Sequence, residues 1–159
     1  MKWALKIRFY VLMIIILLIL LISVISLSNL PFSSIFGGVE KASPSNWISQ
    51  DQIKVYPQFV VLDLPNAVWA SFTNTNSMDP VLDEQSNALE IKPGSALEIK
   101  VGDVISYQTD QGIIVHRVIE EGQDTLGNYF IVKGDNATLA DPVKVRFDQV
   151  QGVVVAVLY

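Results

Sequence analysis

Hydrophobic and polar residues are distributed differently in the two parts of this chain. Residues 9–27 read FYVLMIIILLILLISVISL, nineteen residues without a charge. At a rise of 1.5 Å per residue, a helix of this length covers most of a hydrocarbon core about 30 Å thick. Beyond residue 50, short β-branched and aromatic runs alternate with turn residues. The pattern predicts an N-terminal transmembrane helix followed by a domain built from strands.

A cleaved signal peptide is the competing interpretation of the apolar segment. The apolar part of a signal peptide usually runs about 7 to 15 residues and ends at a small-x-small cleavage site. The segment here is longer, and the sequence SLSNLPF at its end offers only a poor site of that kind. Its length favours a retained anchor.

Charges beside the anchor predict its orientation. Lys2, Lys6 and Arg8 precede the apolar segment, whereas the first charge after it is Glu40. By the positive-inside rule, the N-terminus is cytoplasmic and the rest of the chain lies outside. We expect a cytoplasmic tip and anchor over residues 1–28, a juxtamembrane linker over 29–50 that is rich in Ser, Pro, Gly and Asn, and an extracytoplasmic β domain over 51–159.

Six runs of the external part have the composition of strands: IKVYPQFVVLDL, AVWASF, DVISYQT, GIIVHRVIE, NYFIVKGD and QGVVVAVLY. TDQG is typical of a short hairpin loop and EGQDTLGN of a longer one, so consecutive strands should pair antiparallel. The repeated ALEIK, separated by PGS, predicts two further strands paired around a turn. Without crossover helices, these segments indicate a mainly β domain with mixed antiparallel sheets or a partly open barrel, rather than an α/β fold.

Composition excludes several functions. The external part carries eight Lys and Arg against sixteen Asp and Glu, so no nucleic-acid partner is expected. The chain has no cysteine and one histidine, which excludes disulfides, thiol catalysis and cysteine- or histidine-rich metal sites. Any catalysis must therefore use hydroxyls, carboxylates, amines and one imidazole.

Three polar stretches beside strands can supply such groups. NTNSMDP holds Ser77 just after an apolar run, although such residues also form simple turns. GIIVHRVIE holds His116, which shares a strand face with Ile114 and Val118. An imidazole titrates near neutral pH and can take a proton from a serine, but a lone histidine on an apolar face is also typical of a core residue.

The third stretch, VKGDNATLADP, contains two aspartates. Either Asp135 or Asp141 can accept the second N–H of the imidazole, and either can instead stabilise a turn. Residues 136–138 also spell an N-glycosylation sequon.

The combination resembles the type I signal peptidases, in particular the Ser-His branch of the endoplasmic reticulum and archaea. The Ser-Met-x-Pro motif of that family is matched by residues 77–80, and its Gly-Asp turn before a strand by residues 102–103. Its Ile-Val-His-Arg-Val pattern is matched by residues 114–118, and Lys-Gly-Asp-Asn by residues 133–136 with a second aspartate at 141. The resemblance covers the N-terminal anchor and about residues 70–155. The chain departs from the family in GDNA, where a second Asn is frequent, and in the longer segment between residues 80 and 102.

The resemblance implies a signal-peptidase-like β domain and a membrane-bound serine endopeptidase that cleaves signal peptides from exported preproteins. Ser77 is then the nucleophile, His116 the general base and Asp141 the third member, with Asp135 supporting the site or sharing that duty. Thr75 and the backbone N–H of Ser77 bind the oxyanion. The family requires no cofactor, and its partners are signal peptides, the bilayer and possible subunits of the export machinery.

Two alternatives remain at this point. The bacterial branch of the superfamily uses a Ser-Lys dyad, but Lys92, Lys100 and Lys133 all adjoin Pro or Gly turns rather than the apolar runs that would desolvate a lysine base. The chain can also be a non-catalytic anchored β module, such as an inactive relative in an export complex.

Overall fold

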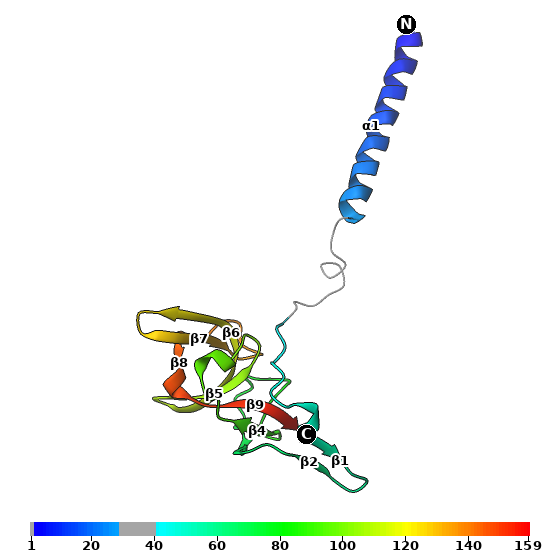
Figure 1. Cartoon of the computed structure of the whole chain (residues 1–159). Coiled ribbons are helices and arrows are strands. Elements are labelled where there is room, and N and C mark those ends of the chain that lie inside the picture. The colour runs from blue at the N-terminus through cyan, green and yellow to red at the C-terminus, as the bar shows by residue number, and fades with distance from the viewer. Residues whose placement is uncertain (1, 29–40) are drawn as a thin grey trace. The chain divides into compact units, whose positions relative to one another are not determined.

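The computed structural model describes residues 2–28 and 41–159 (Figure 1). The chain divides into two compact units, residues 1–40 and 41–159. In the first unit, helix α1 (Lys2–Ser28) confirms the predicted helix, and its segment Lys6–Ile25 is long and apolar enough to cross a membrane. Residues 29–40 of the expected linker lie outside the described residues.

The second unit begins ten residues before the boundary expected at residue 51. Its first residues are fixed to the buried Asp103, whose Oδ1 accepts a hydrogen bond of 2.6 Å from the backbone N–H of Ser45. The neighbouring Gly102 has a φ of +104°, and a Cβ there would lie 2.2 Å from the carbonyl oxygen of Ser43. The Gly-Asp turn therefore holds residues 43–45 against the strands.

The second unit is mainly β, as predicted. Its strands are β1 (Ile53–Val55), β2 (Val60–Leu62), β3 (Val68–Ser71), β4 (Asn87–Ile91), β5 (Val104–Thr109), β6 (Gly112–Asp124), β7 (Gly127–Lys133), β8 (Val145–Arg146) and β9 (Val150–Leu158). Short 3₁₀ helices are η1 (Gln50–Gln52), η2 (Ala96–Glu98) and η3 (Phe147–Gln149). Strands β1 and β2 form a separate hairpin, and the others form one antiparallel sheet in the order β3-β4-β9-β5-β6-β7-β8 (Figure 1). This sheet does not close into a barrel, because β3 and β8 are its two ends.

Two details of the expected hairpins were wrong. The first ALEIK contributes to β4, but the second forms η2, because Glu98 accepts hydrogen bonds from the Gly94 N–H at 2.9 Å and the Ser95 hydroxyl at 3.3 Å and closes a tight turn. The loop predicted over EGQDTLGN is shorter in the structure than expected, since β6 continues to Asp124 and β7 begins at Gly127. Gly127 has a φ of +102°, which allows the tight turn between the two strands.

Alternating residues of the sheet bury both of its faces. One cluster gathers large side chains of β5, β6, β7 and β9, and the other is smaller. The larger comprises Ile99, Ile105, Tyr107, Val118, Phe130, Val132, Val145, Val150 and Val153, and the smaller Met78, Leu82, Ala88, Val104 and Val154. The smaller cluster includes Met78, which directly follows Ser77, so packing helps to fix the predicted nucleophile.

Candidate active site

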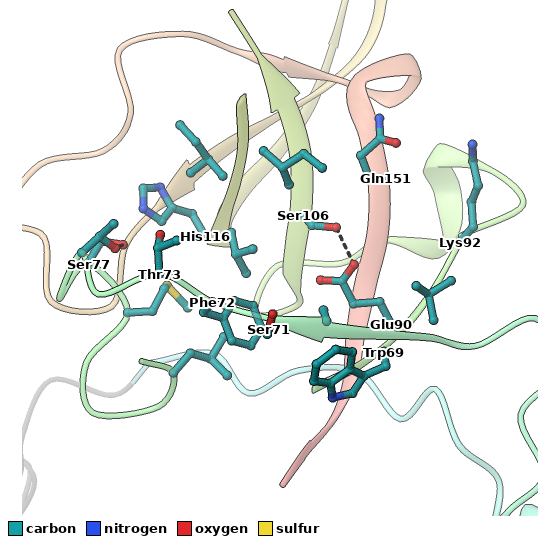
Figure 2. Close-up of a pocket in the computed structure, with 18 residues that line it drawn as sticks. Trp69, Ser71, Phe72, Thr73, Ser77, Glu90, Lys92, Ser106, His116 and Gln151 are labelled. Atoms are coloured by element: carbon teal, nitrogen blue, oxygen red, sulfur yellow. Dashed lines mark hydrogen bonds between the residues drawn. The ribbon is translucent and has the colours of Figure 1, made fainter. Parts of the chain in front are cut away.

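A pocket of about 760 Å³ lies between β3 and the first half of β6. Although these strands are separated by three others in the sheet, both line the pocket, so the sheet curls around it. Strands β4, β9 and β5 contribute Glu90, Gln151 and Ser106. Figure 2 shows Ser77 and His116 at one end of the pocket and Glu90, Lys92 and Trp69 at the other.

Ser77 lies in the segment that follows β3, and a second loop fixes its backbone. Its carbonyl oxygen accepts a hydrogen bond of 3.0 Å from the N–H of Asn136, and the side-chain amide of Asn136 donates to the carbonyl of Asn76 at 3.0 Å. The Ser77 hydroxyl lies 3.1 Å from the hydroxyl of Thr75. Within residues 41–159, nothing accepts a hydrogen bond from the Ser77 N–H, which leaves this donor free for a ligand.

His116 lies on β6 and is paired with Asp141. Its Nδ1 is 2.9 Å from both carboxylate oxygens, and the side chains of the pair are only 12% and 16% exposed. The hydroxyl of the buried Tyr107 donates a hydrogen bond to Oδ2 of Asp141. Burial, and then the adjacent Asp141, raises the pKa of Tyr107, so the phenol stays protonated and can donate. The arrangement holds the carboxylate between a phenol and an imidazole.

Gly134 brings the serine segment and the imidazole together. A Cβ built on this glycine would lie 2.5 Å from the carbonyl oxygen of Ser77 and 3.2 Å from Nε2 of His116. Nδ1 of His116 therefore faces Asp141, while Nε2 faces the side on which Ser77 lies (Figure 2). The Ser77 hydroxyl is hydrogen-bonded to Thr75 rather than to His116 in the described chain. Catalytic hydrogen bonds are often long in a ligand-free protein and shorten when substrate binds.

Asp135 has a different partner. Its two oxygens accept hydrogen bonds from Nε and Nη2 of Arg117 at 2.8 Å and 2.6 Å, and Nη1 of Arg117 donates to the carbonyl of Gly102 at 2.7 Å. Burial acts to raise the pKa of Asp135, but the hydrogen bonds and charge of Arg117 outweigh it, with smaller contributions from Lys41 and His116, and lower the pKa. Arg117 thus links β6 to the Gly102 turn and to the loop that holds Asp135, whose carboxylate is hydrogen-bonded to Arg117 rather than to the imidazole in the described chain.

The structure gathers four of the predicted residues, Thr75, Ser77, His116 and Asp141, at one end of the pocket or beside it. Asp135 lies near them but on the side of Arg117. The sequence analysis missed the roles of Tyr107, Arg117 and Gly134. Arg117 was the detectable one, because an arginine within an apolar strand requires a carboxylate partner.

The lysines of the alternative dyad have other surroundings. Lys92 is exposed and lines the end of the pocket away from Ser77 (Figure 2). Lys100 is half exposed and lies 3.5 Å from Glu121, while Lys133 pairs with Arg117 in the sheet and does not line the pocket. None is a desolvated amine next to the serine.

A scan against protein-family models and a search of the curated proteins found no match to this chain. The geometry of the site and the four sequence motifs are therefore the support for any function.

Proposed function

We propose that this chain is a membrane-bound serine endopeptidase that removes N-terminal signal peptides from exported preproteins, as its resemblance to the Ser-His type I signal peptidases implies. The observation that carries the proposal is His116, whose Nδ1 is bound to Asp141 while its Nε2 faces Gly134 next to Ser77. This is the order of groups that activates a serine: nucleophile, base and a carboxylate that orients the base.

The reaction proceeds in two steps. Ser77 Oγ attacks the scissile carbonyl carbon while Nε2 of His116 takes the hydroxyl proton. The Ser77 N–H and the Thr75 hydroxyl donate hydrogen bonds to the oxyanion. The imidazolium then gives its proton to the leaving amine, and a water molecule hydrolyses the acyl-enzyme by the reverse sequence. Asp141 stabilises the imidazolium, and Tyr107 orients Asp141.

Free strand edges on both sides of the pocket suit an extended peptide. In the described chain, β3 pairs only with β4, and residues 113–116 of β6 pair only with β5, because pairing with β7 begins at Arg117. A peptide between these edges can form backbone hydrogen bonds as an added strand.

The anchor has a purpose in this scheme. A helix long enough to cross the membrane keeps the enzyme and a membrane-held preprotein in one thin layer and raises their effective concentration. With Lys2, Lys6 and Arg8 on the cytoplasmic side, the catalytic domain is extracytoplasmic at the cell membrane, where export subunits are possible partners.

A second candidate function is a non-catalytic peptide-binding module of an export complex. The hydrogen bond of Ser77 to Thr75 instead of His116 favours this alternative. Such a module would use the same pocket without cutting.

The deciding experiment incubates a preprotein with the full-length chain in proteoliposomes. We expect cleavage by the wild type and by the control Ser95→Ala, which lies outside the pocket, and a loss of about 10³-fold or more in Ser77→Ala. Equal cleavage by wild type and Ser77→Ala, or none by either, would favour the non-catalytic module. His116→Lys should not recover activity, because Asp141 would hold the lysine as an ion pair; full rescue would contradict the assigned base.

A further inference from the structure

The end of the pocket away from Ser77 contains a partly buried carboxyl group that the proposed reaction does not use. Glu90 lies on β4 and accepts a hydrogen bond of 2.8 Å at Oε2 from the hydroxyl of Ser106 on β5 (Figure 2). Its other oxygen, Oε1, is buried and has no hydrogen-bond partner among residues 2–28 and 41–159. Desolvation raises the pKa of Glu90, and the Ser106 hydrogen bond opposes this only in part.

The neighbouring strand leaves space for this carboxyl group. Gly152 of β9 lies beside Glu90, and a Cβ there would come within 2.8 Å of Oε2. Gly152 is also the sheet partner of Ser106. A side chain at position 152 would push the carboxyl group away from Ser106, so Gly152 leaves room for the polar pair Glu90 and Ser106 that lines the pocket.

The rest of the pocket wall offers few groups that could satisfy the carboxyl oxygen of Glu90, so leaving this oxygen unpaired destabilises the fold. Much of its wall is apolar, with Val68, Ala70, Phe72, Leu82, Ile114 and Val115. An unpaired buried acceptor costs about 1–3 kcal/mol. Ligand pockets typically combine an apolar wall with a few polar groups that fix the orientation of the ligand. Because Oε1 is itself buried, the Glu90 side chain must rotate toward the pocket before a hydrogen-bond donor of a ligand can satisfy it.

The charges nearby favour a neutral donor. Lys92 lines the same end of the pocket (Figure 2). A cationic ligand group would be attracted by Glu90 but repelled by Lys92, whereas a hydroxyl or amide is not repelled and can still donate to Oε1.

The sheet register places Glu90 beside the start of β3, away from Ser77. Glu90 pairs with Val68, the first residue of β3, and Ser77 follows the end of the same strand at Ser71. A peptide strand added alongside β3, at about 3.3 Å per residue, therefore passes Glu90 several residues away from the scissile bond.

We propose that Glu90, supported by Ser106 and Gly152, forms a subsite that binds a hydroxyl or amide side chain of the substrate several residues from the scissile bond. This inference rests on the proposed function, and it makes Glu90 a determinant of which precursors are cut.

The test uses alanine-based peptides with small residues at the cut and one Asn or Leu placed at each of six positions on either side. Full-length protein in detergent should cleave the Asn peptide about 10-fold faster in kcat/KM than the Leu peptide at one position only. Glu90→Met, which has a similar size and no polar atoms, should abolish or reverse this ratio, whereas Glu90→Gln, which keeps a carbonyl oxygen, should retain part of it. The exposed Glu84→Met is the matched control and should keep the wild-type ratio.

If Glu90 has a structural role instead, the variant Glu90→Met should have a lower Tm than the wild type, whereas the subsite proposal predicts a higher one. Because Glu90→Met removes an unsatisfied acceptor, we expect the Tm to rise by a few degrees. A lower Tm together with an unchanged Asn-to-Leu ratio would overturn the subsite.

The experiment distinguishes an error in the proposed subsite from an error in the proposed protease function. Cleavage that depends on Ser77 without any positional preference for Asn contradicts the subsite alone. If no peptide is cleaved, binding of the same Asn and Leu peptides to Ser77→Ala is measured by fluorescence anisotropy. An Asn preference that Glu90→Met removes then supports the subsite without the protease, and equal binding overturns it.

Discussion

Two aspartates of one loop, Asp135 and Asp141, pair with adjacent residues of β6 and do so in different ways. Asp141 lies against the imidazole of His116 and the phenol of Tyr107. Asp135 is held by Nε and Nη2 of the Arg117 guanidinium. Because successive residues of a strand point to opposite faces, the sheet directs the two pairs to different sides.

The difference shows that the partner determines what a carboxylate can do. A guanidinium keeps its charge at any ordinary pH, so the Asp135 pair stays ionic and its oxygens remain occupied. An imidazole changes its charge near neutral pH, and Asp141 can stabilise the charged form when it appears. We therefore expect one pair to control activity and the other to control stability.

Replacing Asp141 should have the largest effect on activity. In Asp141→Asn the amide fails to stabilise the imidazolium and can hold the wrong tautomer of His116, so kcat should fall by about 10³–10⁴-fold with little change in Tm. Asp135→Asn, assayed on folded protein, should lose less than about 10-fold. Preprotein cleavage and a thermal melt measure both effects, and equal losses of kcat would contradict the division of roles.

Breaking the Arg117 pair should have the largest effect on stability. The side chains of Arg117 and Asp135 are 12% and 5% exposed, so removing one leaves an uncompensated charge. Asp135→Asn or Arg117→Met should lower the free energy of unfolding by about 3–5 kcal/mol, and the double variant Arg117→Met, Asp135→Leu should recover much of the loss. Urea titration of the full chain in detergent, followed by tryptophan fluorescence, measures this. A double variant less stable than either single variant would show that the pair does more than neutralise charge.

Asp135 and Glu90 should contribute to the pH dependence of stability in opposite directions in the wild type, because the pKa of one is lowered and the pKa of the other is raised. The pKa of Asp135 is lowered in the folded state, so its contribution is present above its ordinary pKa of 3.8 and is lost as the pH falls through the folded value. The pKa of Glu90 is raised, so ionisation destabilises the fold as the pH rises from its ordinary value of 4.5 through the folded value. Unfolding at pH 3 to 8 should show the deficit of Asp135→Asn and the gain of Glu90→Met both increasing with pH. If the stability gained in Glu90→Met decreased with rising pH, the upward shift assigned to the pKa of Glu90 would be wrong.

Tyr107→Phe should have the smallest effect. Loss of the phenol removes the hydrogen bond that orients Asp141, so kcat should fall by about 3–10-fold while KM changes little. A purely structural role for the hydroxyl would lower the Tm and leave the kcat of the folded protein unchanged. Tyr129→Phe, at an aromatic ring outside the site, is the matched control.

The elements that the sequence predicts best are those with a strong local signal. The charge-free run of residues 9–27 lies within α1, and each of the six β-branched runs contains at least one strand. The strand predicted for the second ALEIK was wrong, because the side chain of Glu98 accepts a hydrogen bond from the backbone N–H of Gly94 and closes a turn in this segment. Local composition does not include such contacts.

The candidate site could be predicted in part for the same reason. Motifs indicated which polar residues to examine, and the family resemblance favoured Asp141 over Asp135. The residues around the two aspartates do not show which carboxylate reaches the imidazole, because this depends on the side of β6 that each one approaches in the fold. The pairing of Tyr107 with Asp141, 34 residues later in the chain, is likewise a long-range contact that no local pattern encodes.

Gly134 has a consequence for the proposed reaction. It is the point where the backbone of the serine loop and the imidazole approach each other, and the hydrogen atom in place of a side chain is what permits this approach. A single methyl group at position 134 would clash with the carbonyl oxygen of Ser77 and would push the backbone of Ser77 away from the imidazole of His116. A chain can therefore lose its reactivity while it retains every reactive group, which means that an intact set of motifs does not by itself distinguish a working enzyme from a silent one.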